Sequence, residues 1–119
     1  MKGATVPYLK ITTSKSIDAA GKRNLLDAAS KMVAVELSKP EQYVMVSVES
    51  PVAMLFAGAE EPSAFLELRG IGLPESKTSR LSGELCQMIE SHLGIRKDRV
   101  YINFADVTPC LWGWNGDTF

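Results

Sequence analysis

The sequence predicts an α+β fold, a two-layer sandwich in which two helices cover one face of a four-stranded sheet. Two amphipathic helical patterns divide the chain, and short segments of strand-like composition flank each pattern. The order strand, helix, strand therefore occurs twice. Parallel strands joined by right-handed crossovers would place both helices on the same face. The fold is thus predicted to be an internal duplication of one βαβ unit.

The first unit is predicted to contain a strand at residues 7–13, a helix at 17–37 and a strand at 43–48. The first strand alternates in side-chain type, and the second is rich in β-branched residues. The helix carries one apolar stripe at helical spacing, made of Leu25, Ala28, Ala29, Met32, Val33 and Leu37. Ser16 is expected to cap its start, and Pro40 lies just beyond its end.

The second unit repeats this order, with strands at 64–68 and 100–104 around a helix at 77–93. The apolar stripe of this helix consists of Leu81, Leu85, Met88, Ile89 and Leu93. Gly94 follows at the position where a left-handed helix cap is expected. The single histidine, His92, lies in the last helical turn and is expected at the surface.

A sheet with helices on one face leaves its other face bare, and this chain has no third helix to cover it. The apolar segments 54–57 and 110–112 are expected to form edge strands that seek a partner. We therefore expect the chain to oligomerise through sheet edges and faces. The sequence pattern does not give the number of subunits.

The composition excludes several classes of function. The chain has 119 residues, the size of one domain, and its net charge of −1 provides no basic excess for nucleic acid. No apolar run approaches the ~18 residues that span a membrane, and residues 1–6 lack the apolar core of a signal peptide. We expect a cytoplasmic protein at synthesis.

The two cysteines are Cys86 and Cys110. They suggest neither a disulfide framework nor a metal site, and both are expected to be buried.

Several motifs in fixed order resemble the macrophage migration inhibitory factor family, in the tautomerase superfamily. They are Ser38-Lys39-Pro40, Arg69-Gly70-Ile71-Gly72, the run Asp98-Arg99-Val100-Tyr101-Ile102-Asn103-Phe104, and the end from Leu111-Trp112-Gly113-Trp114-Asn115-Gly116 to Thr118-Phe119. The resemblance covers residues 7–119, with residues 1–6 as an N-terminal extension. It implies a homotrimer around a central channel, no cofactor, no metal, and release from cells without a signal peptide.

The resemblance also implies a catalytic base. Keto–enol tautomerisation needs a group that takes a proton from the carbon beside a carbonyl and returns it elsewhere. Family tautomerases use an amino-terminal proline, which Pro7 matches. Lys39 matches the lysine that binds a substrate carboxylate or enolate, and Ile71 matches a position whose backbone contributes to carboxylate binding. Pro7 could otherwise simply begin a strand, and Lys39 could be an ordinary surface lysine.

Tyr101 and Asn103 lie two residues apart, so they share one face of the last strand. In the family the matching residues reach into a neighbouring subunit's pocket, although a polar pair on a wet sheet face is the alternative. Tyr43, Trp114 and Phe119 would form an aromatic rim for a phenyl or indole ring. Interface packing is the alternative for Trp114. Tyr8 beside the proline could line the mouth of the pocket.

Two features depart from the family pattern. Where some members carry Cys-x-x-Cys, this chain has Ser63-Ala64-Phe65-Leu66, so that thiol chemistry is excluded. Pro7 is also joined to Val6, which makes its nitrogen an amide without a basic lone pair. Either a dedicated cleavage exposes Pro7, or residues 1–6 are an artefact of the start site or of cloning, or the site is catalytically silent.

The leading hypothesis is therefore a cofactor-free tautomerase for aromatic α-keto acids such as phenylpyruvate, or for dopachrome-like compounds, active once Pro7 is a free amino terminus. The alternative is a non-enzymatic cytokine-like signalling or binding protein, with a receptor protein as partner and Pro7 blocked. A generic βαβ interaction module is the third hypothesis, with little support from the residues.

Overall fold

The structure is a computed structural model that describes residues 6–119. The four main strands are β1 (Tyr8–Thr13), β2 (Met45–Glu49), β3 (Ala64–Gly70) and β4 (Val100–Asp106), and the helices are α1 (Ala19–Glu36) and α2 (Thr78–Leu93). Short 3-10 turns are η1 (Glu41–Tyr43), η2 (Glu75–Lys77), η3 (Lys97–Arg99) and η4 (Pro109–Leu111), and a small hairpin of β5 (Gly113–Trp114) and β6 (Asp117–Thr118) ends the chain. Within residues 6–119, neither helix has the length and apolar character needed to cross a membrane.

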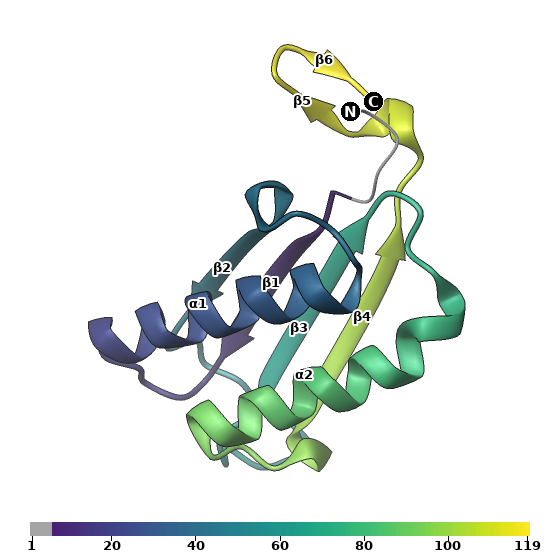
Figure 1. The fold of residues 1–119 in the computed structure, drawn as a ribbon. Coiled ribbons are helices and arrows are strands. Elements are labelled where there is room, and N and C mark those ends of the chain that lie inside the picture. The colour runs from purple at the N-terminus through teal and green to yellow at the C-terminus, as the bar shows by residue number, and fades with distance from the viewer. Residues whose placement is uncertain (1–5) are drawn as a thin grey trace.

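The main sheet confirms the predicted duplication. Its strand order is β2-β1-β3-β4. β1 runs parallel to β2 and β3 runs parallel to β4, while the two units meet through the antiparallel pair β1–β3. Both helices lie on the same face of this sheet, and the β5–β6 hairpin projects beyond the end where β3 and β4 finish (Figure 1). The fold is the predicted two-layer α+β sandwich.

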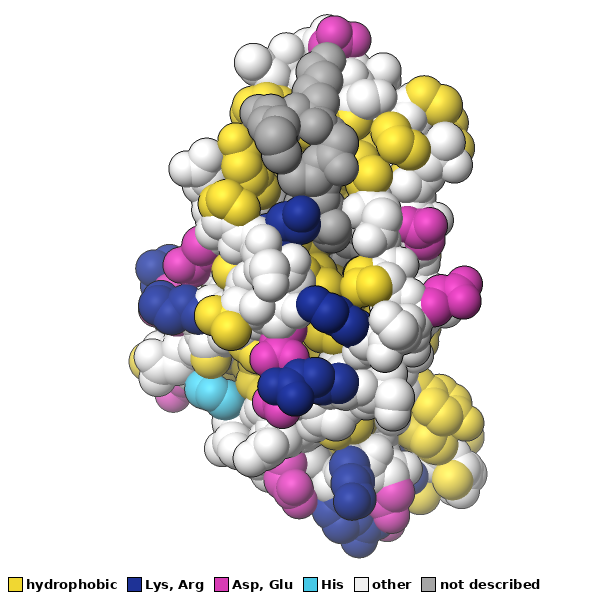
Figure 2. Space-filling view, turned by 45° about the vertical axis from the view of Figure 1, so that its right-hand side comes forward, with side chains coloured by type: hydrophobic (Ala, Val, Ile, Leu, Met, Phe, Trp, Pro, Cys, Tyr) yellow, Lys and Arg dark blue, Asp and Glu magenta, His cyan; other side chains and the backbone are white. Residues whose placement is uncertain are grey.

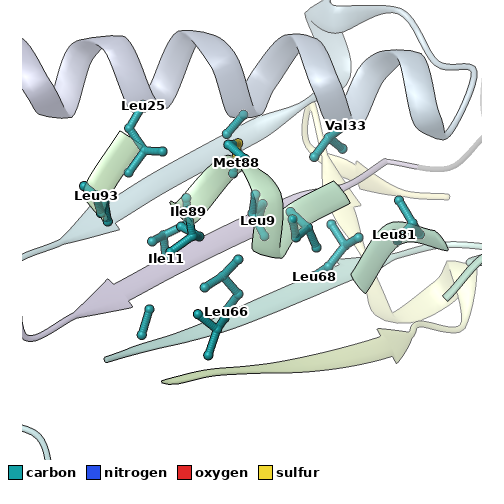
Figure 3. Close-up of a cluster of buried hydrophobic side chains, with 14 of the residues drawn as sticks. Leu9, Ile11, Leu25, Val33, Leu66, Leu68, Leu81, Met88, Ile89 and Leu93 are labelled. Atoms are coloured by element: carbon teal, nitrogen blue, oxygen red, sulfur yellow. The ribbon is translucent and has the colours of Figure 1, made fainter. Parts of the chain in front are cut away.

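The core lies between the sheet and the two helices. Alternate residues of β1 and β3, including Leu9, Ile11, Leu66 and Leu68, point toward the apolar stripes of the helices (Figure 3). Each of these four side chains is completely removed from water. Burial of such a side chain is worth about 1.5–3 kcal/mol, so the strand alternation and the helical stripes together determine which faces meet.

The ends of the elements differ slightly from the prediction. α1 begins after Asp18 rather than Ser16, because the Asp18 carboxylate accepts a hydrogen bond from the Gly21 N–H at 2.7 Å. Gly94 adopts the expected left-handed conformation, with φ of 69°, and ends α2. His92 is exposed in the last turn of α2, as predicted.

The middle of the sheet face opposite the helices is polar. Lys10 pairs with Glu49 at 3.7 Å, and Arg69 pairs with Glu67 at 3.3 Å, all from strand residues that point away from the core. Such charged pairs remain solvated without cost. Charged side chains thus occupy the middle of this face, and exposed apolar side chains of Met45, Phe65 and Tyr101 lie at its ends.

The predicted edge strands at 54–57 and 110–112 are wrong. Phe56 and Ala59 form an isolated bridge around a tight turn, in which Ala57 and Gly58 have positive φ. Residues 109–111 form η4, whose first position is held by Pro109. Because this turn lifts the segment off the sheet, Cys110 is exposed, which contradicts its predicted burial. Cys86 is partly buried, and burial raises the pKa of its thiol.

Candidate active site

The sheet end that carries the start of β1 contains a pocket of about 290 Å³, called here the proline pocket. It is lined by Val6, Pro7, Tyr8, Gln42, Tyr43, Val44, Met45, Trp112, Gly113 and Trp114. The lining thus comes from the starts of β1 and β2 and from the segment that follows β4. Hydrophobic side chains gather at the upper end of the visible face and again at its lower right, and basic and acidic side chains are interspersed between them (Figure 2).

Pro7 lies at the base of this pocket and is almost completely buried. Its carbonyl oxygen accepts a hydrogen bond from the Met45 N–H at 3.0 Å, which continues the β1–β2 ladder to the proline. A proline fits here because the first position of a strand needs no N–H donor. Val6 precedes it in the pocket with only 8% of its surface exposed. The Pro7 nitrogen is therefore placed in an apolar environment, and in this chain it is an amide.

Aromatic side chains close one side of the proline pocket. The rings of Tyr43 and Trp114 meet edge to face with centroids 6.0 Å apart, and Phe119 stacks on Trp114 at 6.1 Å. Tyr8 lines the pocket, and its hydroxyl is hydrogen-bonded to the Ser47 hydroxyl at 2.7 Å. The structure thus brings together the aromatic residues that the sequence singled out. Such a rim suits a flat, apolar ring.

Two hydrogen bonds fix the backbone of Lys39 just after the end of α1. The Lys39 N–H donates to the Ala34 carbonyl at 2.8 Å, and the Ser38 N–H donates to the Val35 carbonyl at 3.1 Å. These two bonds, with Ser38 at a positive φ of 54°, form a Schellman motif. Lys39 is partly buried but is not among the residues that line the proline pocket.

Ile71 lies just after β3 and is 4% exposed. Its segment is tied to the end of β4, because the Val107 N–H donates to the Gly70 carbonyl at 2.8 Å and the Leu73 N–H donates to the Asp106 carboxylate at 3.0 Å. Ile71 does not line the proline pocket either. Its backbone is nevertheless held at the same end of the sheet as Pro7, since β3 runs antiparallel to β1.

Tyr101 and Asn103 lie on the open face of β4, Tyr101 near the start of the strand and Asn103 at its middle. The register pairs Tyr8 with Arg69 and Arg69 with Ala105, so Tyr101 lies four residues, or roughly 13 Å, farther along β4. Tyr101 is 65% exposed and lines a second pocket of about 560 Å³, called here the tyrosine pocket. Its remaining lining residues are Met54, Leu55, Phe56, Ala57, Ser63, Ala64 and Phe65. A single chain therefore does not bring Tyr101 to Pro7.

Sequence reasoning missed two residues of interest. Trp112 lines the proline pocket, and its carbonyl accepts a hydrogen bond from the Phe119 N–H at 3.1 Å. The two tryptophans at 112 and 114 were the available signal. The second missed residue is Arg99, a buried arginine beside Tyr101. Among residues 6–119, no group of three histidine, cysteine, aspartate or glutamate side chains could hold a metal ion.

Known proteins with the same fold and related sequences confirm the resemblance. The profile of the family described as macrophage migration inhibitory factor matches residues 6–119. A macrophage migration inhibitory factor homologue from Brugia malayi is 37% identical over 118 residues, covering 96% of this chain and 99% of the homologue.

Solved structures agree with these sequence relatives. A homologue from Prochlorococcus marinus superimposes with a TM-score of 0.89 at 43% identity, covering 94% of this chain and 98% of that chain. A macrophage migration inhibitory factor-like protein from Entamoeba histolytica gives a TM-score of 0.91 at 28% identity, covering 96% and 99%. This chain therefore belongs to the macrophage migration inhibitory factor family, within the tautomerase superfamily.

Proposed function

We propose that this protein is a cofactor-independent keto–enol tautomerase for aromatic α-keto acids such as phenylpyruvate, or for dopachrome-like compounds. The observation that carries the proposal is the position of Pro7, buried at the base of an aromatic-lined pocket in a member of this family. Members of the family commonly are tautomerases that act on small molecules.

The base in this proposal is the Pro7 nitrogen as a free secondary amine. An ordinary α-amino group titrates with a pKa of about 7.7–8.0, and an apolar surrounding disfavours its charged form. The neutral amine takes a proton from the carbon beside the substrate carbonyl, and the resulting enolate is protonated on oxygen to give the enol. No other reactant is consumed. Lys39 and the backbone at Ile71 bind the acidic end of the substrate.

The remaining contacts come from a neighbouring copy in a homotrimer. Neither Tyr101 nor Asn103 lines the proline pocket of its own chain, and two strands separate β4 from β2. β2 and β4 are the outer strands of the main sheet, so their outer edges are available for a second copy. Tyr101 and Asn103 of one copy would then complete the site of the next, with Tyr43, Trp114 and Phe119 as the ring-binding rim and Tyr8 at its mouth.

The bond between Val6 and Pro7 favours a second candidate function. With Val6 buried in the pocket, the site contains a peptide amide where the base should be. The alternative is a non-enzymatic cytokine-like signalling or binding protein that acts through a receptor. In the enzymatic proposal residues 1–6 form an extension that is absent from the active species, and the protein is cytoplasmic with release that needs no signal peptide.

Phenylpyruvate turnover separates these two functions. The enol absorbs in the ultraviolet, so its formation is followed for the full chain and for a chain that begins at Pro7, while intact mass identifies the first residue of each preparation. We expect the chain beginning at Pro7 to be faster by about 10²–10⁴-fold in kcat. Equal rates for two preparations of verified mass would refute the proline mechanism. An inactive Pro7 chain that still folds as an oligomer would favour the non-enzymatic function.

A further inference from the structure

Arg99 is a buried charge that interacts with main-chain oxygens. It is the last residue of η3 and is 7% exposed. Its Nη1 donates to the Phe56 carbonyl at 2.8 Å, and its Nη2 donates to the Glu61 carbonyl at 2.7 Å and the Ala59 carbonyl at 3.3 Å. Its Nε donates to the Pro62 carbonyl at 3.4 Å. All three guanidinium nitrogens thus bind one segment, residues 56–62.

This segment has little else to hold it in place. It lies between β2 and β3 and contributes no strand to the main sheet, and its bridge joins only its own residues Phe56 and Ala59. The Arg99 guanidinium carbon also lies 5.1 Å from the centroid of the Phe56 ring, a cation–π distance. A planar fork of donors can bind several carbonyls and face a ring at the same time, which an ammonium group cannot do. Arg99 therefore fixes both the turn and the Phe56 ring.

Phe56 in turn packs on Tyr101. The two ring centroids are 4.6 Å apart with an interplanar angle of 37°. Tyr101 is largely exposed, so the Phe56 ring is a main restraint on the phenol. An exposed tyrosine without such a neighbour would sample several rotamers, and ordering it on binding would weaken the complex.

We propose that Arg99 is a positioning residue: it holds Phe56 against Tyr101, so that the phenol is already ordered when it enters the proline pocket of a neighbouring copy. That the Tyr101 phenol serves a neighbouring copy's pocket rests on the proposed function. That Arg99 and Phe56 order this phenol does not. The first repeat offers a parallel, since Tyr43 is the last residue of η1 and packs on Trp114, in the segment that follows β4. In each repeat the last residue of the 3-10 turn that precedes the second strand thus contacts the segment that leaves the other repeat.

Fluorine NMR on the full chain tests the ordering without any catalysis. The sequence has three tyrosines, so fluorotyrosine labelling gives three signals per chain, and Tyr101→Phe identifies the signal of Tyr101. In Phe56→Leu and in Arg99→Lys we expect the Tyr101 signal to shift and narrow, while the signals of Tyr8 and Tyr43 stay in place. Arg96→Lys, at an exposed arginine just before η3, is the matched control and should move none of them.

Phe56→Leu keeps the experiment decisive if Arg99→Lys does not fold. It removes the aromatic ring but retains the hydrogen bonds from Arg99 to the backbone of residues 56–62. An unmoved Tyr101 signal in the folded Phe56→Leu protein would overturn the proposal. Movement of all three signals would overturn it as well, since it would show a general structural role.

Kinetics on a preparation that converts phenylpyruvate tests the consequence for substrate. We expect Phe56→Leu to raise KM by roughly three- to tenfold and to leave kcat and the pH–rate profile unchanged. In a Tyr101→Ala background the same substitution should have no further effect on KM, and full additivity would show that the effect does not pass through Tyr101. If no preparation converts phenylpyruvate, the proposed function fails and the NMR result still decides whether Arg99 orders Tyr101.

Discussion

The two pockets are built from equivalent parts of the two repeats, and only one of them carries a candidate base. The proline pocket combines the starts of β1 and β2 with the segment after β4, whereas the tyrosine pocket combines the starts of β3 and β4 with the segment after β2. Where the first has Pro7 before the outward-facing Tyr8, the second has Ala64 before the outward-facing Phe65. The pocket without a base is the larger, at about 560 Å³ against about 290 Å³.

The pockets also differ in how their outer segments are held. The tyrosine pocket is bordered by a turn that a buried arginine binds through four carbonyl oxygens. The proline pocket is bordered by residues next to the exposed β5–β6 hairpin, which aromatic contacts hold. Duplication of a βαβ unit thus supplies two cavities, and only the proline pocket has a proline at the strand start that lines it.

Arg99 and Tyr43 support the outer segments of the two pockets, and replacing each of them should show how unequally they contribute. We expect the largest effect on stability here. Arg99→Met leaves four carbonyls in part-buried positions without their donor, and we expect a loss of about 3 kcal/mol in the free energy of unfolding. Tyr43→Leu removes one aromatic pair and should cost about 1 kcal/mol. Urea unfolding at one protein concentration measures both, with Arg96→Met as an exposed control. Equal losses would mean that the two supports are energetically alike.

Lys39→Ala tests whether the proline pocket depends on a cation outside its lining. In the proposed tautomerase a charge-assisted contact to the substrate carboxylate is lost, so kcat/KM for phenylpyruvate should fall by roughly ten- to a hundredfold. Loss of the nearby positive charge should also raise the pKa of the Pro7 amine, which moves the acidic, rising limb of the pH–rate profile to higher pH. A profile identical to that of the parent would count against this role.

Trp112→Val should widen the proline pocket and change which ring it prefers. We expect the ratio of kcat/KM for a two-ring dopachrome-like compound over phenylpyruvate to rise by about tenfold. Leu111→Val is the matched control, because Leu111 is 76% exposed and does not line the pocket. If both variants keep the parent ratio, Trp112 does not set the size of the substrate.

The smallest effect concerns the ion pair that joins the two repeats through their helices. The Arg80 Nε donates to the Glu36 carboxylate at 2.7 Å, and this hydrogen bond lowers the pKa of Glu36 below its ordinary value of 4.5. The pair therefore stabilises the fold above pH 4.5 and loses this contribution as the pH falls through the folded-state pKa. Arg80→Gln should flatten the acid dependence of stability in this range. An unchanged dependence of the melting temperature on pH would contradict the assignment.

Most of the fold could be predicted because it follows from periodicity. The stripes that contain Leu25 and Leu85 repeat at helical spacing, and the alternation around Leu9 and Leu66 marks the buried strand face. Helix capping was less certain, since Ser16 and Asp18 both suit that position and only the path of the backbone decides between them.

Parts of the candidate site could not be predicted from the chain alone. Pro7 and Tyr101 were identified together, but the register of β1, β3 and β4 separates them within one molecule. Trp112 lies in an irregular segment without periodicity, so no pattern shows which way it faces. Arg99 belongs to a residue type that is rarely buried, and its partners are carbonyl groups, which every residue possesses.

Because Arg99 recognises peptide oxygens rather than side chains, residues 59–62 can change their side chains without removing an atom that Arg99 binds. Substitutions there leave the grip intact as long as the backbone keeps its path. Protein engineers can therefore graft new side chains onto the turn beside the tyrosine pocket while the bonds to Arg99 remain.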